Sequence, residues 1–150
     1  MPYRKTIAVN RKARFNYDIL ETFEAGLVLK GTEIKAIREG RANLGDAYAK
    51  PNDDELWLLN THIATYSSGT HNNHEPTRPR KLLLHKTQIL HLRKQINTRG
   101  LTVIPLKLYL KNHVAKIELG LARGRRKHDK RRAMIDKYRE QEAKEAIKPR

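Results

Sequence analysis

A basic cluster directly before an apolar run is the most chemically suggestive stretch of the chain. Arg78, Arg80 and Lys81 fall within four residues, and Leu82-Leu83-Leu84 follows. Guanidinium and ammonium groups bind phosphate oxygens, and an exposed leucine beside them can pack on an unpaired base. The alternative is that the leucines form a core strand, in which at least one of the three is buried. The stretch therefore indicates a nucleic-acid contact, a core strand, or both.

Glu24 is an acidic group on an otherwise basic surface, and two roles are open to it. Its carboxylate can pair with a lysine or arginine of the fold. It can also accept hydrogen bonds from a base edge or a ribose 2′-hydroxyl.

Groups typical of catalysis or metal binding are poorly placed. Ser67 and Ser68 are the only serines, and no glycine-rich motif of a phosphate-binding loop occurs. The acidic residues at 53–55 fall in an expected turn, where carboxylates are usually solvated. His71 and His74 have HxxH spacing, but on an expected loop rather than a helix, so a metal site is the weaker interpretation. We expect neither enzymatic activity nor a cofactor.

The charge is the strongest compositional signal. Thirty-two Lys and Arg oppose sixteen Asp and Glu, which gives a net charge of +16 over 150 residues. Residues 1–14 carry five basic residues and no acidic one, and residues 122–150 carry twelve basic and five acidic ones. Such a field attracts a polyanion, most simply a nucleic acid, with an anionic membrane surface as the competing partner. The lack of cysteine and of a long apolar run predicts a cytoplasmic protein.

Residues 21–48 predict a strand, a short helix and a return strand. Alternating apolar residues favour the first strand. Thr32 is expected to cap the helix, Ile34 and Ile37 to face the core, and Gly40 to end it.

The remaining elements predict a mainly β protein. Residues 7–9 are expected to form a first strand, with Asn10 capping a brief basic helix after it. Further expectations are a hairpin over 47–59 with its turn at Pro51-Asn52, a short strand over 63–66 and a long loop over 67–81. A helix is expected to start at Thr87, because Ile89, Leu92 and Ile96 have helical spacing, and to end before Gly100. A hairpin over 101–121 should turn at Asn112-His113. About six short strands with small helices predict an OB-like closed antiparallel β-barrel.

The chain divides by composition into a barrel at 1–121 and a basic C-terminal tail at 122–150. Met134, Ile135 and Tyr138 give the tail only a thin apolar stripe. We therefore expect it to be disordered alone and to become helical where phosphates neutralise its charge.

Eight stretches resemble the SsrA-binding protein (SmpB) family. They are Asn10-Arg-Lys-Ala-Arg14, Glu21-Thr-Phe-Glu-Ala-Gly26, Gly31-Thr-Glu-Ile-Lys35, Arg38-Glu-Gly-Arg-Ala-Asn43, Pro79-Arg-Lys-Leu-Leu-Leu-His85, Val103-Ile-Pro-Leu-Lys-Leu-Tyr109, Glu118-Leu-Gly-Leu-Ala122 and Gly124-Arg-Arg-Lys-His-Asp-Lys-Arg131. The resemblance runs in unbroken order over about residues 7–132. It implies a bacterial trans-translation factor without catalytic activity. Such a factor binds transfer-messenger RNA and carries it into the vacant A site of a ribosome stalled on truncated mRNA.

The resemblance also implies which residues bind the RNA. The family's RNA-binding surface corresponds here to Asn10, Glu24, Lys35, Leu83 and Lys116, with Arg11, Arg38, Arg41, Arg80 and Lys81 as further candidates. These side chains would clasp the elbow and D-loop of the tRNA-like domain, so that the protein replaces a missing anticodon stem.

For the tail, the resemblance implies binding to the small ribosomal subunit, at the rRNA of the decoding centre and in the mRNA channel. The residues placed there are Gly124, Arg125, Arg126, Lys127, His128, Asp129, Lys130 and Arg131, with His128 stacking on rRNA. Residues beyond Arg132 match the family mainly in their basic, helix-prone character. A tail that orders only in an empty, phosphate-lined channel would report that the message has ended.

The alternative function is a basic ribosomal or ribosome-assembly protein whose tail threads rRNA permanently. A membrane partner is not expected, because the tail lacks an amphipathic face rich in leucine or aromatic residues. We expect a monomer.

Overall fold

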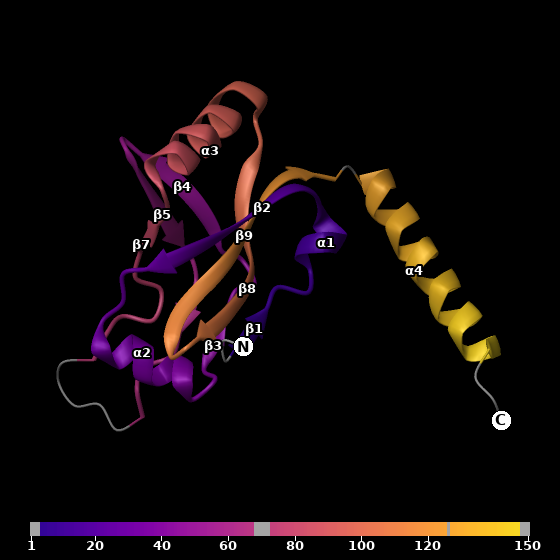
Figure 1. Ribbon diagram of the computed structural model, residues 1–150. Helices are drawn as coiled ribbons and strands as arrows, with labels where there is room; N and C mark the ends of the chain where they lie inside the picture. Colours follow the sequence, from indigo (N-terminus) through magenta and orange to yellow (C-terminus); the bar gives the residue numbers. More distant parts are fainter. Residues whose placement is uncertain (1–3, 68–72, 126, 148–150) are drawn as a thin grey trace.

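The computed structural model describes residues 4–67, 73–125 and 127–147, and it shows a mainly β protein from which one helix projects (Figure 1). The strands are β1 (Arg4–Val9), β2 (Tyr17–Leu27), β3 (Ala42–Asn43), β4 (Tyr48–Asn52), β5 (Glu55–Leu59), β6 (His62–Ile63), β7 (Arg80–Leu83), β8 (Thr102–Lys111) and β9 (Val114–Gly124). The helices are α1 (Ala13–Asn16), α2 (Gly31–Arg38), α3 (Lys86–Arg99) and α4 (Lys127–Ile147). The predicted fold class is confirmed.

The strand pairings form a ring, as a barrel requires. The main sheet has the order β1-β8-β4-β5-β7-β2-β9, and β9 also pairs with β8. All of these pairings are antiparallel. The join between β4 and β8 is narrow, with Ala49 opposite Val103 as its one register pair. Farther along β8, from Lys107 to Lys111, the same edge pairs with β1.

The interior of the ring is filled by aliphatic side chains at alternate strand positions. Leu56 and Leu58 on β5, Leu82 on β7, Leu108 on β8 and Ile117 on β9 have at most 1% of their surface exposed. Removing this much apolar surface from water is the main stabilising contribution, at about 1.5–3 kcal/mol for each large side chain. On β5 and β7 the opposite face is partly open to solvent, whereas Ile104 and Leu106 of β8 pack in a second, smaller apolar cluster.

Helices α2 and α3 lie at opposite ends of the barrel (Figure 1). Ile37 of α2 and Leu92 of α3 are fully buried, as their spacing predicted. Gly40 has φ +78° and Gly100 has φ +63°, so both helices end at the glycines that the sequence suggested. After α2, the backbone N–H of Gly40 donates to the carbonyl of Ile37, and that of Arg41 donates to the carbonyl of Ala36.

The start of α2 corrects one sequence-based expectation. The N-cap residue is Lys30, and Thr32 already lies within the helix. The Glu33 carboxylate reaches back to accept a hydrogen bond of 2.7 Å from the Lys30 backbone N–H. Because this carboxylate satisfies an N–H group at the helix start, a Thr32 cap is not needed.

Two turns also differ from expectation. Pro51 and Asn52 belong to β4, and the hairpin turns at Asp53-Asp54, where Asp53 has φ +53°. An aspartate tolerates this left-handed conformation, whereas proline has its φ fixed near −65°. The Asn10 side chain does not cap α1, and its Nδ2 donates to the carbonyl of Pro105 at 3.0 Å. The N-cap position of α1 is Lys12.

The last strand crosses the expected boundary between barrel and tail. The final hairpin turns at Asn112-His113 as predicted, but β9 continues to Gly124. Ala122 is fully buried against Ala13, Ile104 and Leu106. The barrel therefore needs at least three residues beyond 121. That the tail is disordered when free stays a prediction, and the structure shows residues 127–147 as α4.

Candidate nucleic-acid interface

Two residues of the predicted surface, Leu83 and Lys116, lie in one row across the outer face of the barrel. In the registers of β7, β2, β9 and β8, Leu83 stands opposite Gly26, Gly26 opposite Lys116, and Lys116 opposite Tyr109. Leu83 is 49% exposed, although Leu82 beside it is buried. Gly26 leaves room for it, because a Cβ there would lie 3.3 Å from Leu83 Cβ. The row presents an apolar side chain beside a cation, which suits an unpaired base next to a phosphate.

Glu24 lies on the same face, where residues from two other strands hold its carboxylate. Tyr109 donates its hydroxyl hydrogen to Oε2, Arg4 lies 3.4 Å from Oε2, and Lys111 lies 3.5 Å from Oε1. The Tyr109 hydrogen bond is the main cause that lowers the pKa of Glu24 below its ordinary value. Burial and the Glu24 carboxylate together raise the pKa of Tyr109. Glu24 is therefore ionised and paired within the fold, with 38% of its side chain still open to solvent.

Arg4 also stacks on the Tyr109 ring, with its guanidinium carbon 4.3 Å from the ring centroid. The four side chains form one unit, which we call the Glu24 cluster (Arg4, Glu24, Tyr109 and Lys111). It presents two cations around a fixed carboxylate, so it offers both donors and an acceptor to a ligand.

Asn10 and Arg11 line an open groove on another side of the barrel. The groove has a volume of about 750 Å³ and is formed by the β1–α1 junction and the loops around Asn43–Asp46 and Asn60–His62. The backbone N–H of Asn10 donates to Leu106 at 2.8 Å, which fixes the junction on β8. Arg11 is exposed at its rim.

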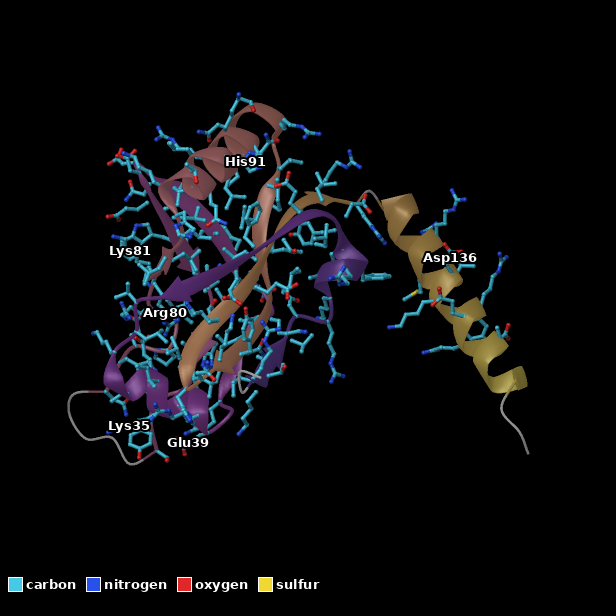
Figure 2. All side chains as sticks on the ribbon, viewed as in Figure 1. Lys35, Glu39, Arg80, Lys81, His91 and Asp136 are labelled. Carbon is cyan, nitrogen blue, oxygen red and sulfur yellow. The ribbon has the colours of Figure 1, made fainter. Side chains whose placement is uncertain are left out.

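Lys35, Arg38 and Arg41 lie on or just after α2, and all three are exposed. Lys35 points over the ring of Tyr66 at 5.3 Å, and Figure 2 shows it at the end of the molecule opposite His91. The Arg41 Nη1 donates to the carbonyl of Thr65 at 3.0 Å. The predicted residues are thus spread over three regions of the barrel rather than gathered in one pocket.

Arg80 does not belong to this surface, which corrects its assignment as an RNA-binding candidate. It is 0% exposed, and its Nε lies 2.5 Å from Oε2 of Glu33, itself fully buried. Nη1 and Nη2 of Arg80 donate to the carbonyls of Thr61 and Pro76. A guanidinium whose donors are engaged in the interior cannot reach a phosphate. Lys81, the next residue, points outward with 40% of its side chain exposed and pairs with Glu55 at 3.3 Å.

His74 is a structural residue of the loop. It is 3% exposed, its Nδ1 lies 2.9 Å from the Thr32 hydroxyl, and its Nε2 lies 2.8 Å from the Ile63 carbonyl. Both ring nitrogens are therefore occupied. His71, the other half of the HxxH spacing, lies outside the described residues. Within the described ranges, no three acidic or histidine side chains are arranged to hold a metal ion.

At the base of the tail, Arg125 is fixed to the barrel. Its Nε lies 2.9 Å from Oδ1 of Asp18, and its backbone N–H donates to Asn16. Arg123 approaches the other oxygen of Asp18 at 3.8 Å. Gly124 ends β9, Arg131 is exposed on α4, and Arg126 lies outside the described residues. Lys127, His128, Asp129 and Lys130 form the first turn of α4, and their side chains lie outside the described part.

Beyond this turn α4 leaves its apolar side chains uncovered. Met134, Ile135 and Tyr138 are between 52% and 63% exposed. Figure 2 shows Asp136 on this helix, to the right of the barrel, and Met134 of the same helix lines a groove together with Phe15 of α1. In the described part of the chain, no helix combines the length and apolar character of a membrane span.

Nothing in the sequence distinguished Arg4, Asp18 or Lys50 as site residues, and Trp57 was not singled out either. Asp18 and Arg4 act through partners far along the chain, so no local pattern marks them. Trp57 had a signal, because it is the only tryptophan and occupies an outward position between two buried leucines.

Comparison with known proteins places these features in a family context. Residues 7–149 match the protein family described as SmpB protein. An SsrA-binding protein of Carboxydothermus hydrogenoformans is 52% identical over 146 residues, 97% of this chain and 98% of the relative. One of Acidothermus cellulolyticus is 51% identical over 144 residues, 96% of this chain and 91% of the relative. A chain of the solved structure "tmRNA-SmpB: a journey to the center of the bacterial ribosome" has a TM-score of 0.68 and 45% identity, and the match covers 84% of this chain and 92% of that chain.

Proposed function

Since the chain belongs to the SmpB family, we propose that it is an RNA-binding factor that binds transfer-messenger RNA and delivers it to stalled ribosomes for trans-translation. The observation that carries the proposal is similarity to SsrA-binding proteins over almost the whole length of both chains. The matching solved structure includes the RNA and the ribosome in its description. The net charge of +16 suits both partners.

The barrel supplies the surface for the tRNA-like domain of the RNA. Its outer face carries Leu83 and Lys116 in one row, with Lys81 beside Leu83 on β7 and the Glu24 cluster on the neighbouring strands. The groove at Asn10 and the cations on α2 extend the contact around the barrel. These groups bind and orient RNA without taking part in a reaction, so the protein acts as a non-enzymatic factor in the cytoplasm.

The tail supplies the contact with the small ribosomal subunit. Residues 122–150 carry a net charge of +7, and α4 stands clear of the outer face of the barrel (Figure 1). A helix with exposed Met134, Ile135 and Tyr138 has surface left to bury against a partner. We propose that this surface is covered in the mRNA channel when no message occupies it.

Competition filter binding tests the RNA partner. Transfer-messenger RNA should displace labelled transfer-messenger RNA far better than ordinary tRNA or rRNA fragments do. Affinity should fall with salt, with a slope set by the number of phosphates contacted. Equal competition by rRNA fragments would instead support a ribosomal or assembly protein.

Truncation tests the division of labour between barrel and tail. The chain should be cut after Arg125, because a cut after Gly120 removes Leu121 and the buried Ala122 from β9. The shortened protein should bind transfer-messenger RNA nearly as well as the full chain and fail to support tagging on stalled ribosomes. Parallel loss of both activities would contradict the division.

A further inference from the structure

Trp57 occupies the centre of a second row across the outer face of the barrel. In the registers of β4, β5 and β7, Lys50 stands opposite Trp57 and Trp57 stands opposite Lys81. On β5 the flanking residues Leu56 and Leu58 are fully buried, so the indole is directed outward by the alternation of the strand. A cation therefore lies on either side of the only tryptophan in the chain.

The indole borders an open groove. The groove has a volume of about 500 Å³ and is lined by Lys50, Pro51, Asn52, Trp57, Leu59 and Pro79. Two prolines, a leucine and the indole make most of it apolar and rigid, and the amide of Asn52 and the ammonium of Lys50 lie at the β4 side. This volume lies within the range of small-molecule sites and accommodates a single nucleobase.

The orientation of the indole is fixed before any ligand arrives. Trp57 Nε1 donates to Oε2 of Glu55 at 3.0 Å. The other carboxylate oxygen of Glu55 lies 3.3 Å from Lys81 Nζ. One carboxylate thus holds the ring and is neutralised by a neighbouring lysine. Such preorganisation reduces the ordering cost of binding.

The charge around the groove favours an anionic ligand. Lys50 forms no ion pair with any described residue, so its charge is uncompensated. The acidic tip of the same hairpin is partly neutralised, because Arg93 lies 3.7 Å from Asp54.

We propose that the Trp57 groove is a binding site for one unpaired nucleotide of an RNA ligand, with the base stacked on the indole and its phosphate on Lys50. The inference rests on the proposed function and deepens it, because the row that carries Trp57 ends at Lys81, a residue of the predicted RNA surface. Lys81 stands opposite Trp57 on the neighbouring strand, and Leu83 follows Lys81 by two residues on the same face of β7. A proline-rich peptide is the other ligand that fits an indole between prolines, but it lacks the charge that Lys50 complements.

The single tryptophan makes the stacking directly observable. Transfer-messenger RNA is titrated into the full-length protein while indole fluorescence and filter binding are recorded in parallel. We expect quenching that saturates at the same RNA concentration as filter retention. The Trp57→Leu variant should bind the RNA about 5- to 150-fold more weakly, and Trp57→Phe should keep most of the affinity, since stacking needs an aromatic face. Lys50→Ala should reduce the salt slope by about 0.7–0.9.

Leu90→Ala is the matched control, because Leu90 is an exposed apolar residue on α3, outside the outer sheet face. It should leave affinity unchanged. Tight filter binding with unchanged fluorescence, or equal affinity of Trp57→Leu and wild type, would overturn the stacking site and leave the proposed function intact. Quenching by a proline-rich peptide but not by RNA would likewise overturn it. Absence of any RNA binding by the wild-type protein would refute the proposed function itself.

Discussion

Glu33 and Arg80 form an ion pair in which neither side chain is exposed to solvent, with 2.5 Å between Oε2 and Nε. The pair joins α2 to β7, and Arg78 adds a second contact of 2.5 Å to Oε1 of Glu33. The Lys30 backbone N–H also donates to this carboxylate. Two elements that carry predicted RNA-binding residues, α2 and β7, are therefore held together by one buried carboxylate.

Arg80 should matter for stability rather than for phosphate contact. Arg80→Met leaves the Glu33 charge buried without its main partner, and this should lower the free energy of unfolding by about 3–5 kcal/mol. Lys81→Met, on the exposed face, should cost less than about 1 kcal/mol. Urea denaturation measures both values. In RNA titrations, Lys81→Met should reduce the salt slope and Arg80→Met should not.

Glu33 should also shape the dependence of stability on pH. Burial acts to raise its pKa, but hydrogen bonds from Arg78, the Lys30 backbone and Arg80 lower it below 4.5. Its stabilising contribution is therefore complete above pH 4.5 and is lost as the pH falls through the folded-state pKa. Thermal denaturation between pH 3 and 7 should show this loss. The Glu33→Gln variant should be less stable than wild type at neutral pH, and its stability should change less as the pH falls from 5 to 3. Glu39→Gln alters an exposed carboxylate and should leave the pH dependence of stability unchanged.

Tyr109 should support RNA binding indirectly, through Glu24. Tyr109→Phe removes the hydroxyl donor to the carboxylate and should lower stability by about 1 kcal/mol. Because Arg4 stacks on this ring and pairs with the same carboxylate, the variant should also weaken RNA binding by a few-fold. A double-mutant cycle of Tyr109→Phe with Glu24→Gln measures the coupling, and additive effects would contradict the Glu24 cluster. Tyr48→Phe, an exposed tyrosine on β4, is the control.

Asp18 should fix where the tail leaves the barrel. Asp18→Asn weakens the ties to Arg123 and Arg125, and partly exposed pairs of this kind contribute up to about 1 kcal/mol. We expect tagging on stalled ribosomes to fall by about two- to five-fold, with affinity for transfer-messenger RNA unchanged. Asp54→Asn at the hairpin tip is the matched control. Equal effects of the two variants on tagging would contradict the prediction that Asp18 positions the tail.

The local sequence was sufficient to predict an element wherever the conformation of that element depends on its own residues. The spacing of Ile89, Leu92 and Ile96 predicted α3, and glycines with positive φ end both α2 and α3. The final hairpin was also predicted, because a tight turn between two alternating runs is a local property. The charge of the chain indicated the class of partner in the same way.

Only the tertiary structure decided which of two neighbouring cations is buried. Arg80 and Lys81 are equally basic, and a period of two shows that they face opposite sides without showing which side is inside. Pairing of β7 with β5 and β2, and the carboxylate of Glu33 47 residues away, turned Arg80 inward. The same holds for Glu24, whose partners come from β1 and β8, and for Trp57, which lies between two lysines of other strands. Contacts between strands depend on register across the whole sheet, and local patterns do not contain that register.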